Sequence, residues 1–255
     1  MLLVVDVGNT NMCFGVYQGA DLVHVFRLTT RADRTSDELA VAVLAGLGLG
    51  RIETGQIDAL IIGSVVPPLR RALVELCADH LSVTPLWVEP GIKTGMPILS
   101  ENPQEVGADR ITNGVAAYTR FGGPVVVVDL GTATTFDVIS AAGEYIGGVI
   151  APGIQISSEA LFARAARLPK VGIERPARVI GRNTVQCMQS GLYYGYVGLV
   201  EGILARIAEE LGTRPRVVAT GGLAALIARD ATSLERIEPN LTLEGLRLLH
   251  ERNPR

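Results

Sequence analysis

Cysteine is scarce in this chain, which holds only three among its 255 residues. Cys13, Cys77 and Cys187 lie far apart and form no C-x-x-C pair, so the sequence predicts neither a disulfide framework nor a zinc site. Long apolar runs are missing as well, since none reaches the roughly 18 residues that a membrane span requires. The N-terminus has no basic segment of the kind that opens a signal peptide. We therefore expect a cytoplasmic protein with no membrane partner.

An excess of positive charge is also missing. Lys and Arg number 23 and Asp and Glu number 26, which leaves a formal net charge of −3. Proteins that bind nucleic acids usually carry a basic surface, so no nucleic-acid partner is expected. Hydrophobic residues, in contrast, make up 48% of the chain, which excludes disorder and supplies a large core. At roughly 150 residues per domain, the length indicates one or two domains.

The most informative feature that is present is an internal repeat. A β-branched run that ends in Asp, one apolar residue and Gly occurs at residues 2–8 and again at 125–131. An apolar strand, a turn signal and a third strand follow both copies. The sequence therefore predicts an α/β protein with two duplicated half-domains, residues 1–122 and 123–255, each a mixed sheet flanked by helices. A ligand cleft is expected between them; a single continuous domain is the alternative.

Helical patterns fill much of the remaining sequence. A helix is expected from Asn102 to Phe121, because Asn102 can act as the N-cap and Pro103 suits the first helical position. A second helix, with Ser36 as its N-cap, is expected over residues 36–47. The tail from residue 238 is expected to form a peripheral helix with a frayed end.

A stripe of glycines marks the long helix expected over residues 184–211. Gly191, Gly195, Gly198 and Gly202 fall on one face of this helix. Each Gly costs a helix about 1 kcal/mol relative to Ala, so four on one face indicate close packing by another helix. That helix could lie in the core, but we favour one related by the two-fold axis of a homodimer.

The two repeated strand ends are suited to holding phosphate. Gly has no Cβ, so backbone N–H groups can approach an anion closely, and the hydroxyl and amide side chains that follow can donate further hydrogen bonds. The Asp of each motif is placed to hold a cation, and Mg²⁺ on a nucleotide typically uses one or two protein carboxylates. The Walker sequence is absent. A strand-to-helix turn at residues 220–222 could add a further nucleotide contact, or could be an ordinary tight turn.

Together, the paired hairpin motifs and the late Gly-Gly turn resemble the actin/Hsp70/sugar-kinase superfamily, whose ribonuclease H-like half-domains hold ATP between them. Three segments narrow the resemblance to type III pantothenate kinases: E-V-G-A-D-R at 105–110, D-L-G-T-A-T-T at 129–135 and G-R-N-T at 181–184. The resemblance covers about residues 1–225. It implies phosphorylation of pantothenate by ATP with Mg²⁺, the first step of coenzyme A biosynthesis, in a homodimer.

The resemblance also implies roles for individual residues. Asp109 would be the general base that takes the proton of the pantothenate hydroxyl, and Asp129 would bind the K⁺ or NH₄⁺ that the family requires. Thr184 would reach pantothenate across the homodimer interface. The expected ATP contacts are Asp6, Val7, Gly8, Asn9, Thr10, Asn11, Met12, Cys13 and Thr132. The expected substrate contacts are Ser100, Gly107, Ala108, Asp109, Arg110 and Thr184.

One position departs from the family pattern. The family often has Tyr immediately before Glu-Asn-Pro, where this chain has Ser100, so the substrate contact at this position stays open. Taken alone, Asp109 and Arg110 favour a surface ion pair on a helix; the flanking motifs reverse this preference, and Arg110 could bind the carboxylate of pantothenate. A kinase for another small alcohol and a non-catalytic regulator on the same scaffold remain the alternatives. A substrate panel tests the first, and stabilisation by nucleotide without turnover would favour the second.

Overall fold

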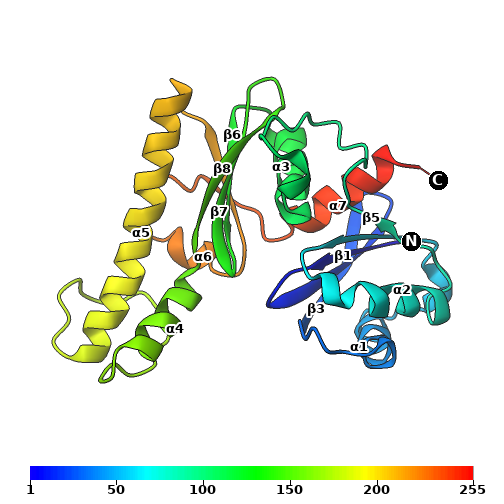
Figure 1. The fold of residues 1–255 in the computed structure, drawn as a ribbon, viewed down its shortest axis with the longest axis horizontal. Coiled ribbons are helices and arrows are strands. Elements are labelled where there is room, and N and C mark those ends of the chain that lie inside the picture. Colours follow the sequence, from blue (N-terminus) through cyan, green and yellow to red (C-terminus); the bar gives the residue numbers. More distant parts are fainter. Residues whose placement is uncertain (255) are drawn as a thin grey trace. The chain divides into compact units, whose positions relative to one another are not determined.

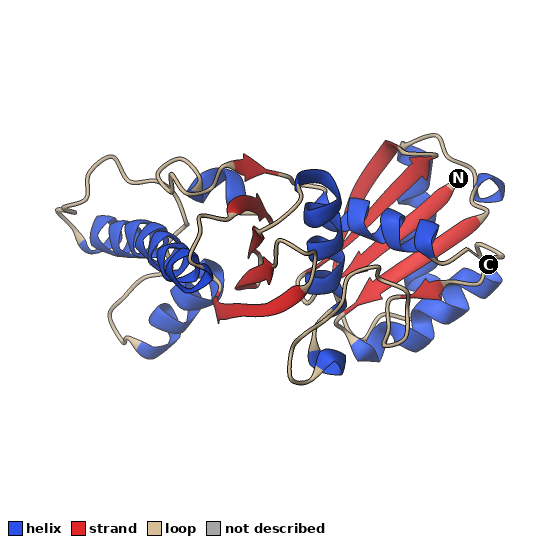
Figure 2. Cartoon of the chain, turned by 90° about the horizontal axis from the view of Figure 1, so that it is seen from above, coloured by secondary structure: helices blue, strands red, loops and turns tan. Residues whose placement is uncertain are grey.

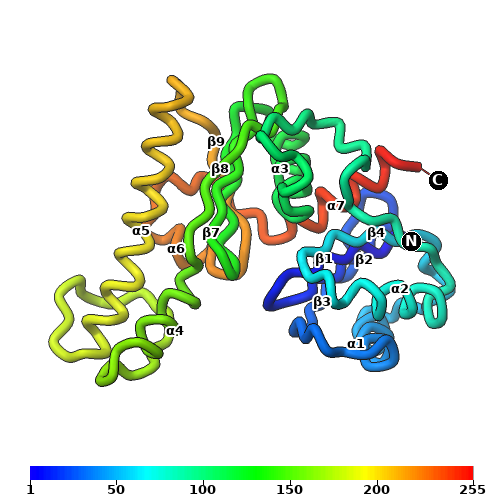
Figure 3. The backbone as a smooth tube through the Cα atoms, in the orientation of Figure 1, coloured from blue at the N-terminus to red at the C-terminus, as the bar shows by residue number. Residues whose placement is uncertain are grey.

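The computed structural model describes residues 1–254, which form two compact units (Figure 1). Unit 1 comprises residues 1–116 together with the chain from Asn240 onward, and unit 2 comprises residues 117–239. Both ends of the chain therefore belong to unit 1 (Figure 3). No helix among residues 1–254 combines the length and the apolar composition that crossing a membrane would take.

Unit 1 is built on a five-stranded mixed sheet with the order β3-β2-β1-β4-β5, whose strands lie side by side in Figure 2. The first three strands form an antiparallel meander, and β4 and β5 extend the sheet in parallel with β1. The strands are β1 (Leu2–Val7), β2 (Asn11–Gln18), β3 (Asp21–Thr29), β4 (Ala59–Ser64) and β5 (Leu86–Trp87). The helices are α1 (Ser36–Leu49), α2 (Arg70–Asp79), the first part of α3 (Ala108–Phe121) and α7 (Leu241–Arg252).

Both faces of the central strand of unit 1 are buried, which explains its nearly continuous apolar sequence. Leu3, Val5 and Val7 form a core with apolar residues of α1 and α2. Val4, which alternates with these residues and therefore points to the opposite face of the strand, is fully buried. Helix α7 packs against β1, β2 and β4.

Unit 2 repeats this topology. Its sheet has the order β10-β9-β6-β7-β8, which matches that of unit 1 when it is written in reverse. The strands are β6 (Val125–Leu130), β7 (Ala133–Ile139), β8 (Tyr145–Pro152), β9 (Arg216–Thr220) and β10 (Arg236–Ile237). The helices are α4 (Ile154–Arg164), α5 (Thr184–Leu211) and α6 (Ala224–Ile227), together with the last residues of α3. The prediction of two duplicated α/β sheets flanked by helices is therefore confirmed.

Two helix starts differ from the prediction. The N-cap of α1 is Thr35 and not Ser36, because the Thr35 side chain and Glu38 form a reciprocal capping box. The continuous helix expected from residue 102 is wrong: Pro103–Glu105 forms one 3₁₀ turn and α3 begins only at Ala108. The Asn102 side chain donates to Glu105 Oε1 (3.2 Å) and makes no N-cap hydrogen bond.

The C-terminal tail also differs from the prediction, because α7 is a core helix and not a peripheral one. Leu241, Leu243, Leu246 and Leu249 are each at most 3% exposed. A Cβ on Gly245 would lie only 2.1 Å from the carbonyl oxygen of Thr112, so α7 and α3 approach closely there. Residues from 240 onward thus pack with unit 1, whereas the expected boundary at 122/123 placed them in the second half-domain.

Candidate active site

The first strand-end loop joins β1 to β2 and is held from both sides. The Gly8 amide donates to the Asn11 carbonyl oxygen (3.0 Å), which closes the turn. Thr30, just after β3, donates its hydroxyl to the Gly8 carbonyl oxygen (2.6 Å) and its amide to the Thr10 carbonyl oxygen (2.9 Å). The side chains of Asn9, Thr10 and Asn11 are exposed. The loop is therefore fixed in shape and presents several hydrogen-bond donors to solvent, which suits an anion.

The remaining residues of the predicted ATP segment are less accessible. Val7 and Met12 are fully buried, and Val7 belongs with Met12 to the core of unit 1. Asp6 and Cys13, which are opposite each other in the β1–β2 ladder, are half-buried. Any contact of Val7 or Met12 with a ligand would therefore involve backbone atoms and not their side chains.

The second strand-end loop joins β6 to β7 and closes in a similar way. The Gly131 amide donates to the Ala133 carbonyl oxygen (3.1 Å), and the Thr132 side chain is exposed. Gly153 supports this loop from the start of α4, because its amide donates to the Thr132 carbonyl oxygen (3.1 Å). A Cβ on Gly153 would lie 2.1 Å from that oxygen, so only glycine fits there without a backbone shift.

Asp129 lies at the end of β6, beside the turn that follows β9. The two strands run parallel, with Asp129 opposite Thr220. Gly221 has φ +91°, and a Cβ there would lie 2.6 Å from Asp129 Oδ1. A Cβ on Gly131 would lie 3.3 Å from the same oxygen. A side chain at position 221 would therefore overlap this carboxylate, and the late Gly-Gly turn of the sequence belongs to the same local structure.

Asp109 occupies the first turn of α3. The first helical hydrogen bond joins the Ile111 amide to the Gly107 carbonyl oxygen (3.1 Å), so Asp109 is the second residue of the helix. Its Oδ1 accepts a hydrogen bond from the Arg110 amide (2.9 Å). A Cβ on Gly107 would lie 2.5 Å from Asp109 Oδ1, so the carboxylate folds back over Gly107 and a side chain there would force it to move.

The environment of Asp109 changes its proton affinity. Burial raises the pKa of this carboxyl group, and the Arg110 amide and guanidinium charge lower it in part. The positive end of the α3 dipole also favours the ionised form. A carboxylate that is largely desolvated but still held by donors is suited to act as a general base near neutral pH.

A cavity of about 410 Å³ lies within unit 1 beside the start of α3. Residues 88–98 and 103–111 form its walls. Apolar side chains dominate the lining, and they include Val88, Ile92, Met96, Ile98, Val106 and Ile111. The end of α7 holds one wall in place, because Asn253 Nδ2 donates to the Lys93 carbonyl oxygen (3.0 Å) and Lys93 N donates to Asn253 Oδ1 (3.0 Å).

Ser100 lies in the segment between the two walls of the cavity. Its Oγ is buried and has no hydrogen-bond partner among the described residues. A buried hydroxyl without a partner costs roughly 1–3 kcal/mol. Ser100 does not line the cavity itself, so its predicted substrate contact stays a prediction.

Thr184 is the first residue of α5 in unit 2. Asn183 caps the helix, with its Oδ1 accepting from the Gln186 amide (2.9 Å), and the Thr184 side chain is exposed. The predicted site residues are thus divided: residues 6–13, Ser100 and Gly107–Arg110 belong to unit 1, and Asp129, Thr132 and Thr184 belong to unit 2.

Two further polar residues can be assigned from their contacts. Asp137 is fully buried and accepts hydrogen bonds from Tyr145 Oη (2.9 Å) and Thr135 Oγ1 (3.2 Å), so it stabilises the hairpin. The Cys187 side chain is exposed. Within residues 1–254 no three His, Cys, Asp or Glu side chains are grouped in a way that could hold a metal ion.

Solved structures with a similar fold support the architecture. A Baf family protein from Campylobacter jejuni matches with a TM-score of 0.61 and 22% identity, over 99% of this chain and 98% of that one. A chain described as a 2-dehydro-3-deoxygalactonokinase from Sinorhizobium meliloti matches with a TM-score of 0.60 and 11% identity, over 98% of both chains. At these identities the likeness shows the fold alone.

Relatives with closer sequences identify the family. The family model described as type III pantothenate kinase matches residues 2–206. A type III pantothenate kinase from Geobacter sulfurreducens is 55% identical over 258 residues, which cover 99% of both chains. Those from Anaeromyxobacter sp. (strain K) and Moorella thermoacetica are 54% and 51% identical over 253 residues, which cover 99% of this chain and 100% of each relative. The chain therefore belongs to the type III pantothenate kinase family.

Proposed function

We propose that this protein transfers the γ-phosphoryl group of ATP to pantothenate, which gives 4′-phosphopantothenate and ADP in the first step of coenzyme A biosynthesis. Its relatives carry the name of this activity over nearly their whole length. The observation that carries the proposal is Asp109, a carboxylate with a raised pKa at the start of a helix that borders a cavity. A cytoplasmic location is part of the same proposal.

ATP binding is assigned to the two strand-end loops. In unit 1, the exposed Asn9, Thr10 and Asn11 and the backbone of the Gly8 turn supply donors for phosphate oxygens. In unit 2, the exposed Thr132 supplies a further contact. The predicted segment from Asp6 to Cys13 is retained as a whole, with Val7 and Met12 contributing through their backbone.

The acceptor site is assigned to unit 1 near the start of α3. Pantothenate carries an apolar dimethyl group, hydroxyl groups and a carboxylate. The apolar cavity suits the first of these, and Ser100, in the segment between the cavity walls, is the proposed contact for a hydroxyl group. Arg110 suits the carboxylate, because a guanidinium group forms paired hydrogen bonds with carboxylates. Gly107 and Ala108 border the same site, and Thr184 completes it from the partner subunit.

The proposed reaction depends mainly on proton transfer from the acceptor hydroxyl and on the alignment of that hydroxyl with the γ-phosphorus. The Asp109 carboxylate accepts the proton of the 4′-hydroxyl group as the hydroxyl oxygen bonds to the γ-phosphorus. The bond between that phosphorus and the β,γ-bridging oxygen breaks, and ADP leaves with the electron pair. Phosphoryl transfer needs alignment and charge neutralisation more than covalent catalysis. The hydrogen bond from the Arg110 amide holds Asp109 Oδ1 and contributes to this alignment.

Two cations are part of the proposal. The K⁺ or NH₄⁺ site is assigned to the Asp129 carboxylate, an oxygen ligand that lies at the end of β6 beside the Gly221 turn. Asp6, the corresponding residue of the first loop, is the candidate to hold Mg²⁺, directly or through water. When bound with ATP, Mg²⁺ neutralises phosphate charge.

A homodimer is proposed through α5. Gly191, Gly195 and Gly198 are exposed, and a Cβ at any of them would have no neighbour within 4 Å. The glycine face therefore does not pack against another helix of its own chain, which favours a second copy over the core as its partner. Two large apolar side chains near the start of the helix, Ile180 (83% exposed) and Val185 (41% exposed), are exposed as well.

The test is direct. Purified protein supplied with ATP, Mg²⁺, K⁺ and pantothenate is expected to form ADP and 4′-phosphopantothenate in equal amounts, and omission of K⁺ and NH₄⁺ is expected to lower the rate. Product is identified by mass. Absence of product at millimolar substrate would refute the proposal. Faster transfer to another small alcohol in a substrate panel would reassign the acceptor.

A further inference from the structure

A strap, defined as residues 171–183, leads into α5 and folds back along the first turns of that helix. Two side chains of α5 hold it. Gln189 Nε2 donates to Glu174 Oε1, and the buried Ser190 hydroxyl donates to the Val179 carbonyl oxygen. The strap is therefore part of the folded surface of unit 2 and not a loose connection.

The end of the strap fixes the start of α5. The Arg182 amide donates to Gln186 Oε1 (2.9 Å). A Cβ on Gly181 would lie 2.5 Å from the Cys187 backbone nitrogen, so the chain passes very close to the helix there. The position of Thr184, between these contacts, therefore depends on the position of the strap.

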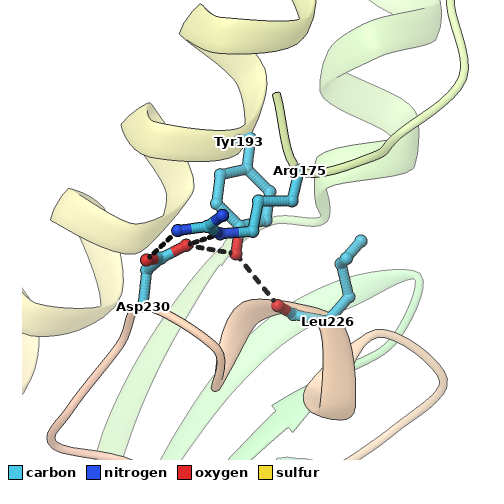
Figure 4. A network of polar contacts seen from close by, with 4 residues as sticks. All are labelled: Arg175, Tyr193, Leu226 and Asp230. Carbon is cyan, nitrogen blue, oxygen red and sulfur yellow. Dashed lines mark hydrogen bonds and ion pairs between the residues drawn. The ribbon is translucent and has the colours of Figure 1, made fainter. Parts of the chain in front are cut away.

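Arg175 fastens the strap to a different part of unit 2 (Figure 4). Its Nε donates to Asp230 Oδ2 (2.6 Å) and its Nη2 donates to Asp230 Oδ1 (2.9 Å), which makes a bidentate ion pair. Tyr193 of α5, itself buried, donates its hydroxyl to the same Asp230 Oδ2 (2.7 Å) and lies 3.1 Å from the Leu226 carbonyl oxygen of α6. One carboxylate thus joins the strap, α5 and the segment after α6.

The ionisation of this cluster is stable around neutral pH. The hydrogen bonds from Arg175 and Tyr193 lower the pKa of Asp230 to about 2. Burial, followed by the hydrogen bond to Asp230, raises the pKa of Tyr193 to about 12. Asp230 therefore stays an ionised carboxylate paired with the Arg175 guanidinium at the pH values used to assay a kinase. The Tyr193 hydroxyl keeps its proton over the same pH range.

We propose that Arg175 is a positioning residue for the acceptor alcohol, because its ion pair with Asp230 fixes the strap and with it Thr184. The inference rests on the proposed function. Removing Arg175 detaches the strap from Asp230 and leaves it held by α5 alone, through Gln189 and Ser190, whereas Tyr193 still holds Asp230 and α6. The segment of α6 follows the Gly221 turn beside Asp129, so the cation and ATP region stays in place. Substitution of Arg175 is therefore expected to weaken binding of the acceptor alcohol and to leave ATP binding unchanged.

The test compares variants in steady-state kinetics with each substrate varied in turn. Arg175→Ala is expected to raise KM for pantothenate about tenfold, with kcat and the KM for ATP changing less than about twofold. Arg175→Lys keeps one charge and is expected to restore part of the affinity. Arg178→Ala, an exposed arginine on the same strap, is the matched control and is expected to behave as wild type.

Hydrogen exchange gives a second measurement that does not depend on turnover. In Arg175→Ala, amides of the strap are expected to exchange faster, while those of the C-terminal half of α5 are unchanged. An unchanged KM for pantothenate would overturn the inference. Equal changes in kcat and in the KM values for both substrates would overturn it as well. If the wild-type protein transfers no phosphate to pantothenate, the proposed function fails. In that case, unchanged hydrogen exchange in the strap of Arg175→Ala would separately refute the role of Arg175 in holding the strap.

Discussion

The two strand-end loops have the same topology but are supported in different ways. The loop of unit 1 is held by hydrogen bonds from Thr30, which lies at the end of the third strand of its meander. The loop of unit 2 is held by close contact with backbone, because Gly153 lies where any side chain would overlap the Thr132 carbonyl oxygen. The two units therefore share a strand order but hold their loops by different contacts. We expect the loop of unit 1 to be sensitive to substitutions that remove a hydrogen bond, and the loop of unit 2 to substitutions that add a side chain.

The units differ further in the acidic residue that each contributes. Unit 1 carries Asp109 on a helix beside a cavity, and unit 2 carries Asp129 at a strand end between two glycines. The first is suited to move a proton and the second to hold a cation. Substitutions in one unit are expected to affect one of these tasks and leave the other unit folded.

The largest effect is expected from Asp109→Asn in unit 1. Loss of a general base costs roughly 10²–10⁴-fold in rate, so kcat should fall by that order while ATP binding persists. The measurement is initial rate with matched ATP binding by calorimetry. A rate within tenfold of wild type would exclude Asp109 as the base.

The pH dependence of the same residue gives a sharper check. Because burial raises the pKa of Asp109, kcat/KM is expected to fall on acidification at a higher pH than an ordinary Asp would give. For stability the sign is opposite: a raised folded pKa favours folding at low pH, and this contribution is lost as the pH rises through that value. Asp109→Asn is therefore expected to unfold at the same or a higher temperature than wild type at pH 7, with the difference vanishing in acid.

An intermediate effect is expected from Gly153→Ala in unit 2. The added Cβ overlaps a backbone oxygen that no rotamer change can move, and forced shifts of this kind cost roughly 1–3 kcal/mol in unfolding free energy. Gly172→Ala, where the space is open, is the matched control. Equal denaturation midpoints for the two variants would show that the second loop is not held by close contact.

The smallest effect is expected from Thr30→Val in unit 1. This change removes the hydroxyl bond to the Gly8 carbonyl oxygen and keeps the shape of the side chain, so it should cost about 1 kcal/mol and raise KM for ATP a few-fold. Thr29→Val, one residue earlier and exposed, serves as the control. Were the two variants indistinguishable in KM for ATP, the Thr30 bond would not shape the first loop.

The parts of the fold that follow from local sequence were predicted, and the parts that depend on distant contacts were not. The repeated meander is visible because β-branched runs and turn residues are local signals. The start of α3 was predicted wrongly, because Asn102 offers a local cap that loses to its own contact with Glu105. The burial of α7 was missed, since its apolar face acquires a partner only when Gly245 reaches α3.

The same division applies to the candidate site. The motifs predict which residues hold phosphate or move protons, because each motif is a short local pattern. The residues that hold the two loops in place could not be identified from motifs. Gly153 and Gly221 are close to Thr132 and Asp129 only through sheet pairing and a returning strand. A signal did exist for Gly221, because β9 continues the sheet beside β6, and a parallel neighbour brings its carboxyl end to the same edge.

The close approach of Gly245 to Thr112 has a consequence for biosynthesis. Helix α7 is synthesised after all the strands of both sheets, and the first half of α3, with Asp109 in its opening turn, packs against it. A nascent chain can therefore complete the strands of both sheets before α7 is available to support α3. Truncation a few residues before position 240 would keep both strand-end loops in the chain and remove the helix against which α3 packs.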